Sequence, residues 1–170
     1  MAAHLAGALT FRADLCRADI DRVRNVTEAT GFFSASEVEV AVELIEATFD
    51  QGATSGYSFL FAERGGTICG YTCFGPVPCT AASFDLYWIV VDAACQGQGI
   101  GKRLLVRTEQ LIREAGGRQL YAETSSRRQY RPTRAFYRHA GFLQAARLRD
   151  FYAPGDSKII YCKVLNRAST

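Results

Sequence analysis

The sequence predicts a mixed α/β fold, in which a mixed, mostly antiparallel β-sheet is flanked by helices. Strand-like and helix-like segments alternate along the chain, and its most strand-like segment leads through a glycine-rich turn into an amphipathic helix. Of the 170 residues, 48% are hydrophobic, which supplies one substantial core. Neither an internal repeat nor a Pro/Ser-rich linker divides the chain. We therefore expect a single domain over residues 1–170, with its core at about 8–165.

The first elements are expected to be a strand and a helix. Residues 9–13 predict a short strand. Residues 15–27 predict a helix, with Asp14 at its cap and acidic Asp19 soon after. Gly31 then ends the helical pattern.

A second helix and a β-hairpin are expected to follow. Ser36 and Glu39 have the Ser-x-x-Glu spacing of a capping box, and the apolar periodicity behind them is helical. The β-rich runs 57–63 and 67–74 are joined by an Arg-Gly-Gly turn, which is typical of antiparallel hairpins.

The second half of the chain is expected to begin with a central strand. Residues 84–92 are apolar on both faces, as buried central strands are. A helix follows from Gly99 to the Gly-Gly pair at 116–117, and its crossover predicts parallel pairing with the next strand. The remaining predicted elements are strand 119–123, helix 132–139, and strands 143–151 and 158–165.

The glycine-rich turn between strand 84–92 and the following helix is the strongest functional signal. Glycines let backbone N–H groups approach a ligand, and the free N–H groups of the first helical turn favour a diphosphate. The turn is no Walker loop, because Arg103 rather than Ser or Thr follows Lys102. Nor does it fit a Rossmann fingerprint, because Gly97, Gly99 and Gly101 are each two residues apart.

Two motifs give the sequence a family resemblance. Residues 96–101 (QGQGIG) match the Q/R-x-x-G-x-G/A motif of the Gcn5-related N-acetyltransferases (GNAT), and residues 133–142 resemble that family's A-x-x-F-Y-x-x-x-G-F segment. The resemblance extends over roughly residues 8–165. It implies acetyl-CoA as cosubstrate and direct transfer of its acetyl group to a primary amine in a ternary complex.

The resemblance also implies a set of cofactor-binding residues. The backbone of the glycine-rich turn would hold the pyrophosphate, and the end of the central strand would lie beside the pantetheine arm. Tyr130 stands where family members often carry an asparagine that binds pantetheine, so the sequence departs from the family pattern at this contact. The expected contacts are Ile89, Val90, Val91, Gln96, Gly97, Gln98, Gly99, Ile100, Gly101, Lys102, Tyr130, Arg134 and Tyr137.

Three residues are the expected catalytic groups. Tyr137 resembles the family's tyrosine that protonates the departing sulfur, and a phenol with a pKa of about 10 keeps its proton at neutral pH. It could equally pack its helix against neighbouring aromatic residues. Asp85 and Glu123 are alternative general bases, each at a position similar to a glutamate used by family members. Burial among apolar neighbours would raise the pKa of Asp85.

Composition narrows the other possibilities. A net charge of +3 with dispersed basic residues does not indicate nucleic-acid binding, although an arginine run that includes Arg134 could meet the 3′-phosphate of CoA or simply be solvated. Spacing of the cysteines and histidines does not favour a metal site, and the six cysteines are expected to be free and mostly buried. The absence of a long apolar segment favours a cytoplasmic protein without membrane contact.

The acceptor is left open by the sequence. A small-molecule amine or an amino acid is favoured, with a protein N-terminus or a lysine as the alternative. From another class, the chain could be a non-catalytic acyl-CoA sensor. A homodimer formed through the final strands is a further expectation from the resemblance.

Overall fold

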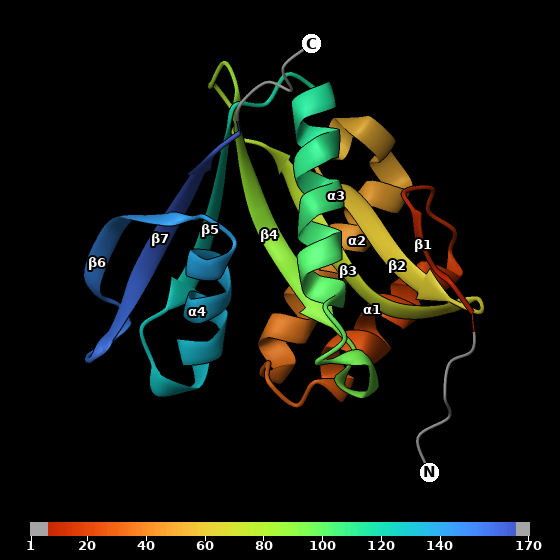
Figure 1. Cartoon of the computed structure of the whole chain (residues 1–170), viewed down its shortest axis with the longest axis horizontal. Coiled ribbons are helices and arrows are strands. Elements are labelled where there is room, and N and C mark those ends of the chain that lie inside the picture. Colours follow the sequence, from red (N-terminus) through yellow and green to blue (C-terminus); the bar gives the residue numbers. More distant parts are fainter. Residues whose placement is uncertain (1–6, 166–170) are drawn as a thin grey trace. The chain divides into compact units, whose positions relative to one another are not determined.

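The computed structural model describes residues 7–165 and confirms the mixed α/β class (Figure 1). A seven-stranded sheet has the strand order β1-β2-β3-β4-β5-β7-β6. Short 3₁₀ helices cover Gly52–Ser55, Ala93–Cys95 and Arg128–Tyr130. The strands are β1 (Leu9–Arg12), β2 (Ser58–Arg64), β3 (Thr67–Pro76), β4 (Ser83–Val91), β5 (Gln119–Ser125), β6 (Leu143–Ala153) and β7 (Asp156–Val164), and the helices are α1 (Ala18–Ala29), α2 (Ala35–Gln51), α3 (Ile100–Glu114) and α4 (Arg131–His139).

The chain forms two compact units. The first contains the described residues up to Gly75 together with Trp88–Thr108. The second contains Pro76–Tyr87 and the described residues from Glu109 onward. The single-domain organisation over residues 1–170 stays a prediction.

The first unit has its core between helices α1 and α2 and the β2–β3 hairpin. Val23 and Ile45 from the helices meet Phe61 and Tyr71 from the strands, and all four side chains are buried. The hydroxyl of Tyr71 lies 2.7 Å from that of Thr27, so the phenol is satisfied inside the core. These contacts anchor the hairpin that the Gly-Gly turn predicted.

Helix α3 contributes to the first unit through its N-terminal part. Position 70 on β3 requires glycine, because the backbone of β4 and the side chain of Leu104 lie close to Gly70. A Cβ atom there would be 2.5 Å from the Val90 carbonyl oxygen and 3.2 Å from Leu104 Cδ1. The neighbouring hydroxyls of Thr72 and Thr108 are 2.8 Å apart. Strand β3 therefore meets α3 through small and hydrogen-bonded side chains.

The predicted cap of α2 is wrong by two residues. The capping box is formed by Ser34, whose hydroxyl accepts from the Glu37 N–H at 3.3 Å while Glu37 accepts from the Ser34 N–H at 2.8 Å. The sequence contains two overlapping Ser-x-x-Glu spacings, and only the extended backbone of Ser34 places a side chain at the cap. Glu39 of the other spacing instead forms an ion pair with Arg24.

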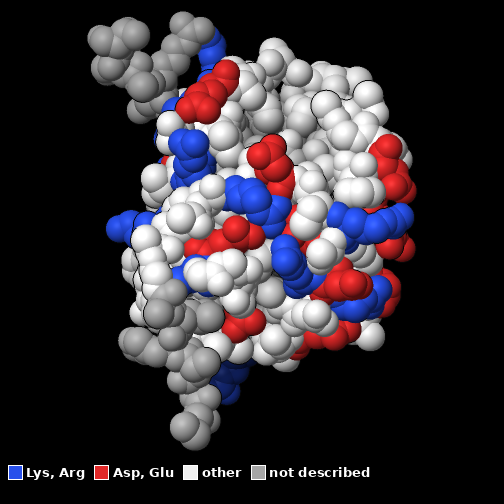
Figure 2. Space-filling view, turned by 90° about the vertical axis from the view of Figure 1, so that its right-hand side faces the viewer, with Lys and Arg blue, Asp and Glu red and all other residues white. Residues whose placement is uncertain are grey.

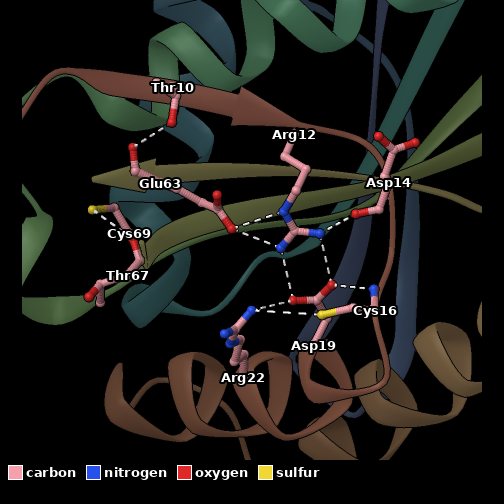
Figure 3. Close-up of polar contacts among 9 residues, drawn as sticks. All are labelled: Thr10, Arg12, Asp14, Cys16, Asp19, Arg22, Glu63, Thr67 and Cys69. Carbon is pink, nitrogen blue, oxygen red and sulfur yellow. Dashed lines mark hydrogen bonds and ion pairs between the residues drawn. The ribbon is translucent and has the colours of Figure 1, made fainter. Parts of the chain in front are cut away.

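The predicted start of α1 is also wrong. Asp14 does not cap the helix, which begins at Ala18. Asp19 is fully buried, and its carboxylate accepts hydrogen bonds from Arg12 and from the Cys16 N–H (Figure 3). The carboxylate therefore organises the β1–α1 connection, a role that an acidic residue near a helix start does not reveal in the sequence.

The second unit confirms the predicted parallel crossover. Ser83–Leu86 of β4 pair in parallel with Gln119–Ala122 of β5, and β7 lies antiparallel on the other edge of β5. Helix α4 packs on one face of this sheet, where the Tyr137 ring contacts those of Tyr161 and Phe142.

The described surface shows mixed charge. On the face drawn in Figure 2, Lys and Arg side chains are interleaved with Asp and Glu. Exposed ion pairs such as Arg24–Glu39 occur among the described residues. Within the described residues, no helix is long and apolar enough to span a bilayer.

Candidate active site

The glycine-rich turn lies in the first unit and enters α3 directly. Gly97 and Gly99 have φ angles of 76° and 73°, a left-handed backbone that residues with a Cβ adopt at a cost. Helix α3 begins at Ile100, and the Arg103 N–H donates to the Gly99 carbonyl at 3.1 Å. The N–H groups that precede Arg103 in the first turn lack partners inside the helix and are suited to phosphate oxygens. The turn therefore fits a diphosphate.

Side chains around the turn fix its shape. Asp92 accepts from the Ala94 N–H at 2.8 Å, and Gln96 donates to the Val91 carbonyl at 3.1 Å. Arg64, at the end of β2, donates to the Gln98 side chain at 2.8 Å. Arg64 was missed in the sequence because it lies 34 residues from Gln98 and belongs to neither motif.

Gly99→Ala is expected to raise the Kd for CoA about tenfold, because an alanine in the left-handed region costs roughly 1–2 kcal/mol per residue and pushes the turn from its shape. Isothermal titration calorimetry measures the change. The matched control is Gly155→Ala in the β6–β7 turn, whose φ is 83° and whose Cβ would also meet open space. Equal CoA affinity in wild type and Gly99→Ala would contradict a phosphate-binding turn.

Tyr137 is buried on α4 in the second unit and is 4% exposed. Its ring centroid lies 5.4 Å from that of Phe142 and 5.6 Å from those of Tyr161 and Phe136. Burial raises the pKa of its phenol above the ordinary value, so the hydroxyl keeps its proton at neutral pH. No hydrogen bond holds this hydroxyl within the part of the chain that the structure describes. Tyr137 thus packs its helix and also retains its phenolic proton.

Asp85 and Glu123 lie on the same face of the β4–β5 pair. Asp85 is the parallel partner of Tyr121, and Glu123 is two residues further along β5. Burial raises the pKa of Asp85, the negative charge of Glu123 raises it further, and Lys158 opposes both. The expected direction for Asp85 is confirmed.

The two carboxylates differ in their surroundings. Glu123 forms a 2.5 Å ion pair with Lys158, whose ammonium also lies 4.1 Å from the centroid of the Phe151 ring. The Glu123 side chain is 47% exposed, whereas Asp85 is half-buried. The two carboxylates therefore differ in exposure, and that of Glu123 is held in an ion pair with Lys158.

Tyr130 and Arg134 both support the segment after β5. Tyr130 is buried and precedes α4 directly. Arg134 donates from one nitrogen to the carbonyls of Ser125 and Arg127, at 2.7 and 2.9 Å. Arg127 in turn lies 3.1 Å from Asp156. Arg134 and Arg127 are therefore bonded to the fold, although Arg127 is 54% exposed.

The cysteines have no disulfide partners in the described structure. Cys69, Cys73 and Cys95 are buried, Cys16 and Cys79 are exposed and Cys162 is half-buried, so the expectation of mostly buried thiols holds for only half of them. Cys95 lies in the glycine-rich turn, and burial, followed by the contact with Cys69, raises its pKa to about 11. Its thiol is therefore protonated at neutral pH and is a poor nucleophile.

Comparison with known proteins identifies the family to which the chain is similar. A family model described as an acetyltransferase (GNAT) domain matches residues 55–144, more than half of the chain. The N-alpha-acetyltransferase RimI of Mycobacterium tuberculosis is 32% identical over 108 residues, a match that covers 62% of this chain and 65% of that protein. The match thus spans just under two thirds of that curated relative.

Solved structures share the fold. A GNAT-family protein from Desulfovibrio desulfuricans is 45% identical with a TM-score of 0.92, and the superposition covers 94% of this chain and 100% of that chain. The yncA protein of Salmonella typhimurium, solved with its cofactor acetyl-CoA, is 19% identical with a TM-score of 0.72, covering 96% and 98%. The likeness to yncA shows the fold alone.

Proposed function

We propose that this chain, which belongs to the GNAT acetyltransferase family, transfers the acetyl group of acetyl-CoA to a primary amine. The observation that carries the proposal is the left-handed glycine turn at the start of α3, which fits the diphosphate of the cosubstrate. The backbone of residues 96–102 would bind that diphosphate, and Ile89, Val90 and Val91 would lie beside the pantetheine arm. Lys102 and Arg134 are the proposed cationic contacts.

Acetyl-CoA supplies an acetyl group activated as a thioester. The acceptor nitrogen forms a bond to the acetyl carbon while the carbon–sulfur bond breaks, without a covalent link to the protein. Asp85 accepts the proton that the attacking amine loses, directly or through a water molecule. Tyr137 donates its phenolic proton to the departing sulfur. The raised pKa of Asp85 and the protonated state of Tyr137 support these two roles.

The acceptor class is a primary amine on a small molecule, an amino acid or a peptide N-terminus. The relative named N-alpha-acetyltransferase supports a peptide N-terminus as an acceptor to be tested beside small amines. A sensor that binds acetyl-CoA without turnover is the alternative. Initial-velocity kinetics combined with intact-protein mass distinguish these cases. A ternary-complex pattern and an unmodified chain are expected, whereas an acetylated chain in the absence of acceptor would contradict direct transfer.

Asp85→Asn is expected to lower kcat about 100-fold, because removal of a general base typically costs 10²–10⁴-fold. The acidic limb of the kcat/KM profile should disappear with it. Because the pKa of Asp85 is raised, this limb is expected above the ordinary value of about 4, with activity rising as pH rises and Asp85 loses its proton.

The rival base is tested by Glu123→Gln. Removal of the negative charge of Glu123 lowers the pKa of Asp85, so the acidic limb should persist and move to lower pH. A limb that vanishes in Glu123→Gln and survives in Asp85→Asn would assign the base to Glu123 instead.

A further inference from the structure

Thr124 on β5 carries a buried hydroxyl that makes no hydrogen bond. The residue is 6% exposed, and its Oγ1 atom is one of two buried side-chain polar atoms without a partner in the described residues, the other being Arg64 Nε. Buried hydroxyls in folded proteins nearly always have a partner, because leaving one unpaired costs free energy. An orphaned hydroxyl at this point of the chain therefore calls for a ligand or a bound water.

Thr124 lies near the end of β5, beyond the part of this strand that pairs with β4. The last residue pair between β4 and β5 is Leu86 with Ala122, and Thr124 lies two residues further along β5. On its other edge β5 continues to pair with β7, where Thr124 is opposite Ile159. At Thr124, β5 is therefore paired with β7 but no longer with β4.

Thr124 shares a sheet face with the proposed acid. Side chains two residues apart on a strand point to the same face, so Thr124 lies on the face of Ala122 and of its β7 partner Tyr161. The Tyr161 ring packs on that of Tyr137, with centroids 5.6 Å apart. This face of the second unit therefore carries the unpaired Thr124 hydroxyl together with Tyr161, whose ring contacts the proposed acid.

We propose that the Thr124 hydroxyl donates a hydrogen bond to a carbonyl oxygen of the acyl-pantetheine end of acetyl-CoA. This inference rests on the proposed function. A carbonyl oxygen can only accept, and the threonine hydroxyl is a donor with no competing partner in the protein. The bond adds Thr124 to the proposed binding residues, and Thr124 belongs to neither sequence motif.

The test is a pair of variants measured by calorimetry with acetyl-CoA and with CoA, and by thermal unfolding. Thr124→Val replaces the hydroxyl by a methyl group of similar shape. It should lower the affinity for acetyl-CoA about five- to tenfold while leaving the Tm of the ligand-free protein unchanged or higher, because an unpaired polar atom is removed. Thr124→Ser keeps the hydroxyl and should keep the affinity, with a lower Tm from the lost methyl group.

The control is Thr108→Val, at a buried threonine whose hydroxyl is bonded to Thr72. This variant should lower the Tm and leave the affinity unchanged. A Thr124→Val protein that binds acetyl-CoA as wild type does, or that loses stability, would overturn the inference and assign the hydroxyl to a bound water or a structural partner. Failure of the wild-type protein to bind acetyl-CoA would instead overturn the proposed function. If Thr124→Val loses affinity for acetyl-CoA alone, the hydrogen bond is to the thioester carbonyl. If it loses affinity for both acetyl-CoA and CoA, the bond is to a carbonyl of the pantetheine arm.

Discussion

Tyr137→Phe is expected to lower kcat for acetyl transfer by about 100-fold or more while leaving the affinity for CoA nearly unchanged, since loss of a general acid typically costs 10²–10⁴-fold. The phenylalanine keeps the ring contacts with Phe142 and Tyr161, so the core of the second unit is preserved. Only the transferable proton is lost. Steady-state assays of CoA release measure kcat, and calorimetric titration measures the affinity for CoA.

The matched control is Tyr71→Phe, at a buried tyrosine in the first unit whose hydroxyl is bonded to Thr27. Loss of this hydrogen bond should lower the free energy of unfolding by about 1 kcal/mol and leave kcat unchanged. Turnover of Tyr137→Phe within twofold of wild type would show that this tyrosine only packs its helix. Because burial raises the pKa of Tyr137, the rate difference should persist through neutral pH rather than appear at one end of the profile.

Asp19→Ala is expected to lower the free energy of unfolding by about 3 kcal/mol, as removal of one partner from a buried ion pair does. The Asp19 carboxylate is fully buried and accepts two bonds from Arg12, both at 2.9 Å, with Cys16 N at 2.8 Å and Arg22 at 3.0 Å (Figure 3). Arg12 also bonds to Glu63 on β2, so the carboxylate links β1 and α1 to the hairpin. Urea unfolding measures the loss.

The exposed pair Arg24–Glu39 supplies the control. Glu39→Ala should change stability little, because solvent screens an exposed ion pair. An Asp19→Ala protein as stable as wild type would contradict the structural role given to the buried carboxylate.

The pH dependence of this contribution has a definite sign. Burial alone would raise the pKa of Asp19, but hydrogen bonds from Arg12, the Cys16 N–H and Arg22 outweigh it and hold the pKa at about 2. A carboxyl pKa below its unfolded value of about 3.9 stabilises the fold above that pH and ceases to do so as pH falls through about 2. The linked contribution is about 2 kcal/mol, so the difference between wild type and Asp19→Ala should shrink between pH 5 and pH 2.

The order of the strands and helices followed from local patterns. Alternation predicted the β2–β3 hairpin, and the change of period after Gly99 predicted α3 and its parallel crossover. Helix starts were less well determined, because Ser34 and Ser36 offer the same capping spacing and the choice depends on backbone angles. Asp14 does not cap α1 as predicted, because the connection before the helix is bonded to the side chains of Arg12 and Asp19 instead.

The candidate site was predictable where a short motif carries it. Gly97 and Gly99 and the neighbourhood of Tyr137 are written within a few adjacent residues. The Glu123–Lys158 pair is different, because it depends on the register of β5 against β7 over 35 positions of chain. Arg64 beside Gln98 and the unpaired hydroxyl of Thr124 likewise arise only when distant segments are brought together.

The central claim is that the chain moves an acetyl group from acetyl-CoA to a primary amine. The most direct test follows CoA release over a panel of small amines, amino acids and peptides with free N-termini, and records the mass of every acceptor in the same reactions. The account predicts at least one acceptor that gains an acetyl group in equal amount to the CoA released. Acetyl-CoA binding without an acetylated product from any amine in the panel would contradict it and favour a sensor.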